Sequence, residues 1–453
     1  MTQEQNFTEG RIYHPLITFA LPVLLALFLQ AMYGGVDLLV VGQFASTADV
    51  SGVSTGSMIM QTVTSLIAGL TMGITVIVGQ AIGRRDPEMA GKTIGSGIAL
   101  FAAFSVVLAA VLVAGAGQIA RCMHAPQEAF SQTTAYVRIC GAGTFFIFAY
   151  NVLGGIFRGI GDSSMPLITV AIACVLNIAG DLLFVAVFHL GTAGAAYATV
   201  LSQAVSVLLS ILIIRKRKLP FHFSRKDVCF NWALIAGILK MGTPIALQDL
   251  LVGMSFLVIQ LIVNSIGLVA SAGVGVAEKV CGFVMLVPSA FSQSMSAFTA
   301  QNIGALKPER ARKALWYGIG TSLAVGLLMG YTAFFHGDML SGLFARDGQV
   351  IGAASSYLKA YAIDCLLTSF LFCFIGYYNG CGKTLFVMLQ GIFAAFCIRI
   401  PVAYFVSRIP GVSLFEIGLA TPCSTIVQII MCMIVFVRMK KNGSCCSIPE
   451  ARS

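Results

Sequence analysis

Long runs of apolar residues alternate with short polar connections along almost the whole chain. A membrane-spanning helix needs roughly 20 mostly apolar residues, and twelve runs reach about that length. Strands are not expected, because membrane β-barrels show short alternating segments instead of long apolar runs. The pattern predicts an all-α integral membrane protein with twelve transmembrane helices at residues 15–42, 50–77, 93–115, 131–157, 165–188, 193–214, 243–266, 271–299, 313–335, 351–378, 384–406 and 414–437.

Composition agrees with a lipid environment. The 453 residues are 58% hydrophobic and only 10% charged, whereas soluble domains carry about 25% charged residues. The net charge of +10 does not indicate nucleic-acid binding, because the Lys and Arg residues cluster in the short connections. The first apolar run, 14–41, is too long for a signal-peptide core, so we expect it to be retained as a helix.

Basic residues mark one side of the predicted bundle. They concentrate in alternate connections, at 84–92, 215–226 and 307–313, whereas the opposite connections contain only Arg121 and Arg346 together with Arg408. Cytoplasmic loops carry the excess of Lys and Arg. The chain is therefore expected in the cell membrane with both termini cytoplasmic.

An internal repeat divides the chain. The segment GQAIGRRDPEMAGKTIGSGI (79–98) recurs 221 positions later as AQNIGALKPERARKALWYGI (300–319). The same offset of 221 positions relates FRGIGDS (157–163) to YNGCGKT (378–384). Six helices per repeat place both halves in the membrane the same way up, and such parallel repeats are a transporter plan. The expected organisation is an N-terminal lobe (1–214), a cytoplasmic linker (215–242), a C-terminal lobe (243–437) and a cytoplasmic tail (438–453).

Five acidic residues lie inside apolar runs: Asp37, Asp181, Asp249, Glu278 and Asp364. An acid at a helix centre costs about 2.5–3.5 kcal/mol on insertion scales, so these residues are functional candidates. Asp249 is expected near the cytoplasmic end of its helix, where a purely structural role is favoured. Glu278 and Asp364 can line a second, C-terminal cavity, and a structural role is equally open for them. The basic residues within the runs, Arg138, Lys359 and Arg399, are expected to be counter-charges or anchors near the interface.

The acids of the first half have polar neighbours at helical spacing. Asp37, Asp181 and Thr199 fall at similar depth in the outer half of the membrane. Asn177 and Asp181, like Tyr33 and Asp37, are four residues apart and share a helix face; Gln30 lies one turn further in. Burial and a second carboxylate both favour the protonated form of an acid, so this cluster can exchange a proton, or hold Na⁺ at Asp37 and Asp181. The alternative is a polar network that only fixes helix packing.

Catalytic and metal signatures are absent. The sequence contains no HExxH, GxSxG or P-loop motif, so an enzyme is not expected. The 13 Cys residues lie mostly inside apolar runs and show no metal-ligand spacing, so neither a metal nor a cofactor is predicted beyond the coupling ion, H⁺ or Na⁺. Cys445 and Cys446 receive no assigned role.

The two repeats, the Gln-x-Ile-Gly connections after helices 2 and 8, RGIGD (158–162) and the stretch 277–305 together resemble the multidrug and toxic compound extrusion (MATE) family over essentially the whole chain. The resemblance implies two V-shaped six-helix lobes and alternating access. It implies a monomeric antiporter that exchanges H⁺, in preference to Na⁺, for lipophilic and often cationic compounds. Partners would be small organic substrates and membrane lipid, and no nucleic acid.

Within that family the chain resembles the DNA-damage-inducible F branch. Asp37 follows the kinking Pro22 by fifteen residues, and the helix 5 motif Asn-x-x-x-Asp matches Asn177 and Asp181. The resemblance implies a coupling-cation site at Asp37, Asp181, Asn177 and Thr199, and a substrate cavity at Gln30, Tyr33 and Asn151.

Two other functions are less compatible with the sequence. A lipid-linked saccharide flippase of the same superfamily is the nearest alternative, but it would need a polar or cationic cavity for pyrophosphate. A receptor or scaffold would not need intramembrane acids at matched depth.

The Lys/Arg asymmetry makes a testable prediction about topology. In a Cys-depleted background, Arg217→Cys should react with an impermeant thiol reagent only from the cytoplasm, and Arg346→Cys only from outside. Reversed labelling at either position would refute the orientation.

Overall fold

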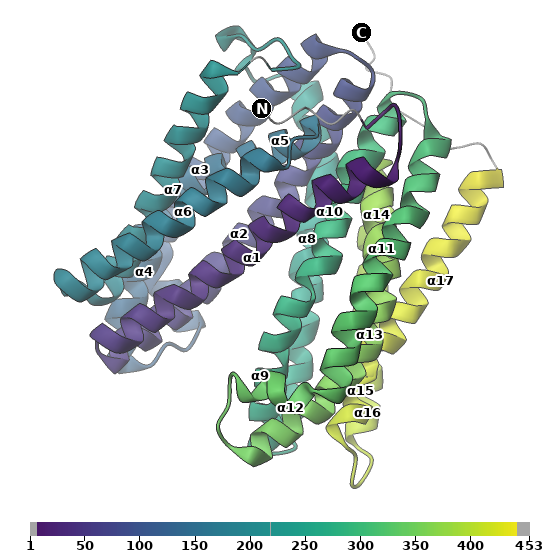
Figure 1. Cartoon of the computed structure of the whole chain (residues 1–453). Coiled ribbons are helices and arrows are strands. Elements are labelled where there is room, and N and C mark those ends of the chain that lie inside the picture. Colours follow the sequence, from purple (N-terminus) through teal and green to yellow (C-terminus); the bar gives the residue numbers. More distant parts are fainter. Residues whose placement is uncertain (1–6, 218, 442–453) are drawn as a thin grey trace. The chain divides into compact units, whose positions relative to one another are not determined.

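The computed structural model describes residues 7–217 and 219–441 of the chain. Every regular element within those residues is helical (Figure 1), which confirms the all-α fold class. The helices are α1 (Tyr13–Phe44), α2 (Thr47–Gly83), α3 (Pro87–Cys122), α4 (Phe130–Ala142), α5 (Thr144–Ile160), α6 (Ser164–Asp181), α7 (Gly191–Lys216), α8 (Trp232–Asn264), α9 (Leu268–Val284), α10 (Leu286–Gly304), α11 (Pro308–Phe335), α12 (Gly337–Gly342), α13 (Gly348–Gly380), α14 (Thr384–Phe393), α15 (Ile400–Ser407), α16 (Leu414–Gly418) and α17 (Ala420–Lys441). Short 3₁₀ or π segments are η1 (Gln127–Ala129), η2 (Leu182–Val187), η3 (Arg225–Asp227) and η4 (Ala394–Arg399).

Among the described residues, eleven helices or helix runs are long and apolar enough to span a membrane, and a twelfth span results if one bent pair is counted as one. The bent pair is 127–142 with 144–160, which meet at 54°. The expected single helix 131–157 is therefore broken at Gly143. A Cβ at that position would lie 2.5 Å from the Val200 side chain, so only glycine allows the bend to press against α7.

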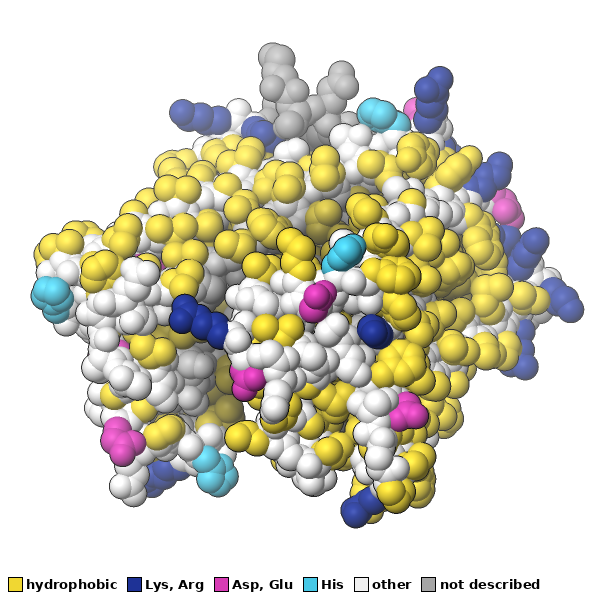
Figure 2. Space-filling model, turned by 60° about the horizontal axis from the view of Figure 1, so that its bottom comes forward, with side chains coloured by type: hydrophobic (Ala, Val, Ile, Leu, Met, Phe, Trp, Pro, Cys, Tyr) yellow, Lys and Arg dark blue, Asp and Glu magenta, His cyan; other side chains and the backbone are white. Residues whose placement is uncertain are grey.

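The surface is as apolar as a lipid-facing surface must be. Large apolar side chains such as Leu39, Val106 and Leu261 are each about two-thirds exposed, and Figure 2 shows hydrophobic side chains over much of the visible face. Large exposed apolar areas mark sites of protein or membrane contact. Spread over long helices, they indicate contact with lipid chains.

The connection between the repeats is shorter than the expected linker 215–242. Helix α7 continues to Lys216 and α8 already begins at Trp232. Lys240 thus lies inside α8, since one cation near a helix end is compatible with a helix that continues toward the interface. The described part of the tail, 438–441, is the last turn of α17. Cys445 and Cys446 lie outside the described residues.

The chain forms two compact units that do not follow the repeat boundaries. Of the described residues, the N-unit contains 21–246, and the C-unit contains 7–20 and 247–441. The changes of unit fall inside α1 and α8, close to Pro22 and Pro244 respectively. The first turns of α1 thus pack with the C-unit, and the first turns of α8 pack with the N-unit.

Small residues explain how α8 begins in the N-unit. A Cβ added to Gly73 would lie 2.3 Å from the Ile238 carbonyl oxygen, and one added to Gly242 would lie 2.3 Å from the Leu70 carbonyl oxygen. Gly69 makes a similarly close approach to Ala246. Close backbone approach at Gly-x-x-x-Gly spacing is a standard way of packing helices in lipid, where apolar burial alone does not drive association.

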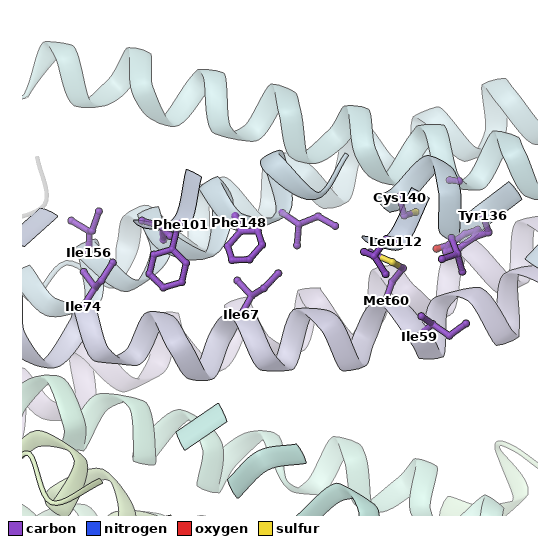
Figure 3. Close-up of a cluster of buried hydrophobic side chains, with 14 of the residues drawn as sticks. Ile59, Met60, Ile67, Ile74, Phe101, Leu112, Tyr136, Cys140, Phe148 and Ile156 are labelled. Carbon is purple, nitrogen blue, oxygen red and sulfur yellow. The ribbon is translucent and has the colours of Figure 1, made fainter. Parts of the chain in front are cut away.

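Aromatic and aliphatic side chains fill the N-unit between its helices. Figure 3 shows Ile67 and Ile74 of α2 against Phe101 of α3 and Phe148 of α5. The Phe101 and Phe148 rings lie 5.7 Å apart. This packing fixes the helices that carry the candidate site.

Arg310 fixes the start of α1 to the C-unit. Its guanidinium donates hydrogen bonds to four backbone carbonyls, those of Phe7, Glu9, Gly10 and Arg11, at 2.7–3.2 Å. The fully buried Phe7 ring packs on Phe19 and Phe298, and Asn302 Nδ2 donates to the Phe7 carbonyl at 3.1 Å. We call residues 7–12 with these contacts the N-terminal anchor.

The anchor predicts a measurable loss of stability. Arg310→Gln should lower the free energy of unfolding by on the order of 2–3 kcal/mol, because hydrogen bonds from a charged donor are lost. The measurement is the melting temperature in detergent. The control, Lys313→Gln, removes an exposed cation from the same helix, and equal melting temperatures for the two variants would show that the anchor contributes nothing.

Candidate functional site

Asp37 is buried in the second half of α1. Its side chain is 4% exposed, and Thr199 Oγ1 on α7 donates to its Oδ2 at 3.3 Å. Within the described part of the chain its other oxygen, Oδ1, has no hydrogen-bond partner. The structure therefore brings together Asp37 and Thr199, which lie 162 positions apart in the sequence.

Asp181 and Asn177 approach Asp37 from α6. Both side chains are fully buried, and both lie within polar contact range of Asp37. Yet neither carboxylate oxygen of Asp181 and neither amide atom of Asn177 has a hydrogen-bond partner among the described residues. We call Asp37, Asp181, Asn177 and Thr199 the acidic cluster.

Close packing of α6 against α7 brings Asp181 and Thr199 to the same partner, Asp37. A Cβ on Gly180 would lie 3.0 Å from the Ala198 Cβ, and one on Gly194 would lie 3.0 Å from the Phe184 backbone. Directly after Asp181 the chain turns into the π-helix η2, Leu182–Val187. Such π segments occur frequently at functional sites, where they reorient the helix.

The chemistry of the cluster follows from its unsatisfied groups. A buried carboxylate without a partner is costly, and two that face each other are stable together only when a proton or a cation compensates their charge. The carboxylates, the Asn177 carbonyl and the Thr199 hydroxyl are all oxygen donors. The cluster is thus built to take up one positive charge. The described residues contain no group of three His, Cys, Asp or Glu side chains that would form a metal site.

The predicted cavity residues line a pocket of the N-unit one turn away. Gln30 and Tyr33 contribute from α1 and Asn151 from α5; Thr64, Tyr150, Val170, Ala173, Ser202 and Gln203 complete the lining. The Asn151 amide donates to the Ile147 carbonyl at 2.8 Å. The cavity volume is about 40 Å³, which holds water and is far below the ~300 Å³ of a small-molecule site.

Sequence reasoning missed two polar residues of this region. Gln203 Nε2 donates to the Tyr33 hydroxyl at 3.5 Å, and the buried Tyr136 of α4 lies beside Asp37 and Thr199. The spacing of Gln203 from Thr199, four residues on one helix, was a usable signal. Nothing in the sequence pointed to Tyr136, because its helix α4 is separated from α5 by the bend at Gly143.

The remaining intramembrane acids lie elsewhere. Asp364 on α13 is buried and Glu278 on α9 is partly buried, both in the C-unit. The expected position of Asp249 near a helix end was wrong. Because α8 begins at Trp232, Asp249 lies in mid-helix, and its side chain is exposed on the surface of the C-unit.

A family model described as MatE matches residues 22–183 and again residues 244–405. The chain belongs to the MatE family. The double match begins at Pro22 and Pro244, in agreement with the internal repeat. The chain is a multi-pass membrane protein of this transporter family, with 11–12 spans.

Relatives of known name match nearly the full length. The chain is 27% identical over 397 residues to the "Probable multidrug resistance protein YpnP" of Bacillus subtilis, covering 87% of this chain and 88% of the relative. It is 23% identical over 415 residues to the "Multidrug export protein MepA" of Staphylococcus saprophyticus, covering 90% of each. The branch within the MATE family stays a prediction.

Solved structures share the fold. A structure described as the "outward-facing conformation of a multidrug resistance MATE family transporter of the MOP superfamily" aligns with a TM-score of 0.90 at 21% identity, over 98% of both chains. A MOP superfamily transporter from Pyrococcus furiosus, described as having a binding pocket of reversed polarity, aligns at 0.89 and 21% over 97% and 98%.

Pro22 is expected to provide a bend in α1 during transport. It lies inside α1 next to the change of unit, and proline removes a helical hydrogen bond and favours a kink. Pro22→Ala should insert at the wild-type level but transport more slowly, because a regular helix resists bending. Efflux per inserted molecule measures this, and an unchanged rate would exclude Pro22 from the cycle.

Proposed function

We propose that this chain is a multidrug efflux antiporter that exchanges protons, in preference to sodium, for lipophilic and often cationic organic compounds. Family membership and the names of its relatives support drug export. The acidic cluster supports cation coupling, since two fully enclosed carboxylates face each other without a cationic side chain among their polar neighbours. That is the observation on which the proposal rests.

The proposed cycle links the cluster to the pocket through α1. Gly34 and Gly35 separate Tyr33 from Asp37, and a Cβ on either glycine would meet nothing within 4 Å. A glycine pair in an unpacked stretch of helix bends easily. Protonation of Asp37 or Asp181 removes a charge there, α1 relaxes, and substrate leaves. Loss of the proton restores the charge that attracts a cationic substrate.

The small pocket fits this cycle. With room for water only, the pocket is too small for a drug-sized compound. Substrate entry then requires α1 to move away from α5 and α7. The same motion would bring Gln30, Tyr33 and Asn151 into contact with substrate.

A lipid-linked saccharide is not favoured as the substrate. Its pyrophosphate would require cationic side chains, and the residues that line the N-unit pocket include neither Lys nor Arg. We also propose that the protein acts as a monomer in the cell membrane and that both of its termini are cytoplasmic.

The test separates charge from packing. Asp37→Asn and Asp181→Asn keep the side-chain volume and should fold, because a neutral amide costs less to bury than a carboxylate. Each should lose most gradient-driven export, by on the order of 10-fold or more, since an amide cannot exchange a proton. Ethidium efflux from proteoliposomes under separately imposed proton and sodium gradients is the measurement.

Glu128→Gln is the matched control, because it neutralises an exposed acid in the short turn η1, at the very start of the bent span and away from the acidic cluster. It should transport at the wild-type rate. Normal export by both Asp variants would refute the coupling site, and export driven by sodium alone would replace the proton as the coupling ion.

A further inference from the structure

A buried arginine lies in the interior of the C-unit. Arg399 ends the π-helix η4, between α14 and α15, and is 5% exposed. Its Nη1 donates to Ser255 Oγ on α8 at 3.0 Å, and its guanidinium lies 4.4 Å from the centre of the Phe256 ring. Its Nε has no hydrogen-bond partner among the described residues.

Asp364 is the acidic group within electrostatic range of Arg399. It is 2% exposed on α13, near Thr425 of α17. In the described part of the C-unit the two charges have no carboxylate–guanidinium contact within 4.0 Å, and Asp364 Oδ1 also lacks a partner. The two buried side chains therefore interact electrostatically without forming a closed ion pair.

The other groups around this pair are neutral or further away. Tyr357 and Tyr361 of α13 also face Arg399. Glu278 of α9 is within electrostatic range of Tyr357, and its neighbour Lys279 is exposed. Arginine keeps its charge in proteins under all ordinary conditions, so the positive charge beside Asp364 is permanent.

We propose that Arg399 is a built-in counter-cation for Asp364, which denies the C-unit a free site for a monovalent cation. The ligand class that Arg399 excludes is a small monovalent cation such as Na⁺. Where the proposed function is correct, the pair confines cation coupling to the acidic cluster of the N-unit.

The experiment measures sodium binding without relying on export. All variants carry Asp37→Asn and Asp181→Asn, so that the N-unit cluster has no carboxylate with which to bind sodium. The readout is the melting temperature in detergent with NaCl against choline chloride at equal ionic strength. Arg399→Met should create a sodium-specific rise in melting temperature several-fold larger than that of the parent, because Asp364 then lacks its counter-charge.

Two further variants separate this role from simple packing. Arg399→Lys keeps the charge and should respond to sodium like the parent. Adding Asp364→Asn to Arg399→Met should abolish the sodium response and recover most of the melting temperature, since both buried charges are gone.

The outcomes are decisive in each case. If Arg399→Met shows no larger sodium response than the parent, or keeps its response with Asp364→Asn, the proposal is wrong. If Arg399→Met alone does not fold, the double substitution decides: a folded double variant supports charge compensation, and an unfolded one shows that Arg399 acts through Ser255 and Phe256 instead. Neither result depends on whether the N-unit couples transport to protons.

Discussion

The cost of an uncompensated charge in the membrane interior constrains this structure more than any other interaction. Each intramembrane acid costs about 2.5–3.5 kcal/mol unless a partner compensates it. The chain nevertheless buries Asp37, Asp181 and Asp364 to below 5% exposure. The helices around them must therefore supply polar partners, and the identity of those partners decides what each site can do.

The helix packing that provides those partners depends on small residues. Gly180 and Gly194 bring α6 and η2 against α7, and so bring Asp181 and Thr199 to the same partner, Asp37. Gly143 allows α4 and α5 to bend against the same helix. In lipid, close backbone approach of this kind replaces much of the hydrophobic driving force that packs soluble proteins.

The first turns of α1 belong to the C-unit and those of α8 to the N-unit, and this arrangement has a mechanical consequence. The N-terminal anchor fixes the beginning of α1 in the C-unit, whereas Asp37 fixes its second half in the N-unit through Thr199. A change of charge at Asp37 therefore acts on a helix whose other end is held by Arg310. Pro22 lies between the two attachments, where a bend can absorb the strain.

Much of this could be predicted from the sequence, because apolar run length and helical spacing are local properties. Run length gave the number of spans to within one bent pair, and the spacing of Asn177 and Asp181 identified one face of the acidic cluster. The break at Gly143 and the position of Asp249 were not predictable in this way. Both depend on tertiary contacts. The break at Gly143 depends on the contact with α7, and the position of Asp249 depends on the packing of α2 against the first turns of α8.

The two units solve the same electrostatic problem differently. Both contain a π segment in the corresponding long helix, η2 after Asp181 and η4 up to Arg399. In the N-unit the segment follows a second acid, Asp181. Two carboxylates therefore lie together, and only a mobile cation can compensate their charge. In the C-unit the segment carries a guanidinium, so the charge of Asp364 is compensated by the chain itself. A repeat that keeps its fold but changes the sign of one buried charge can thereby restrict cation exchange to a single half.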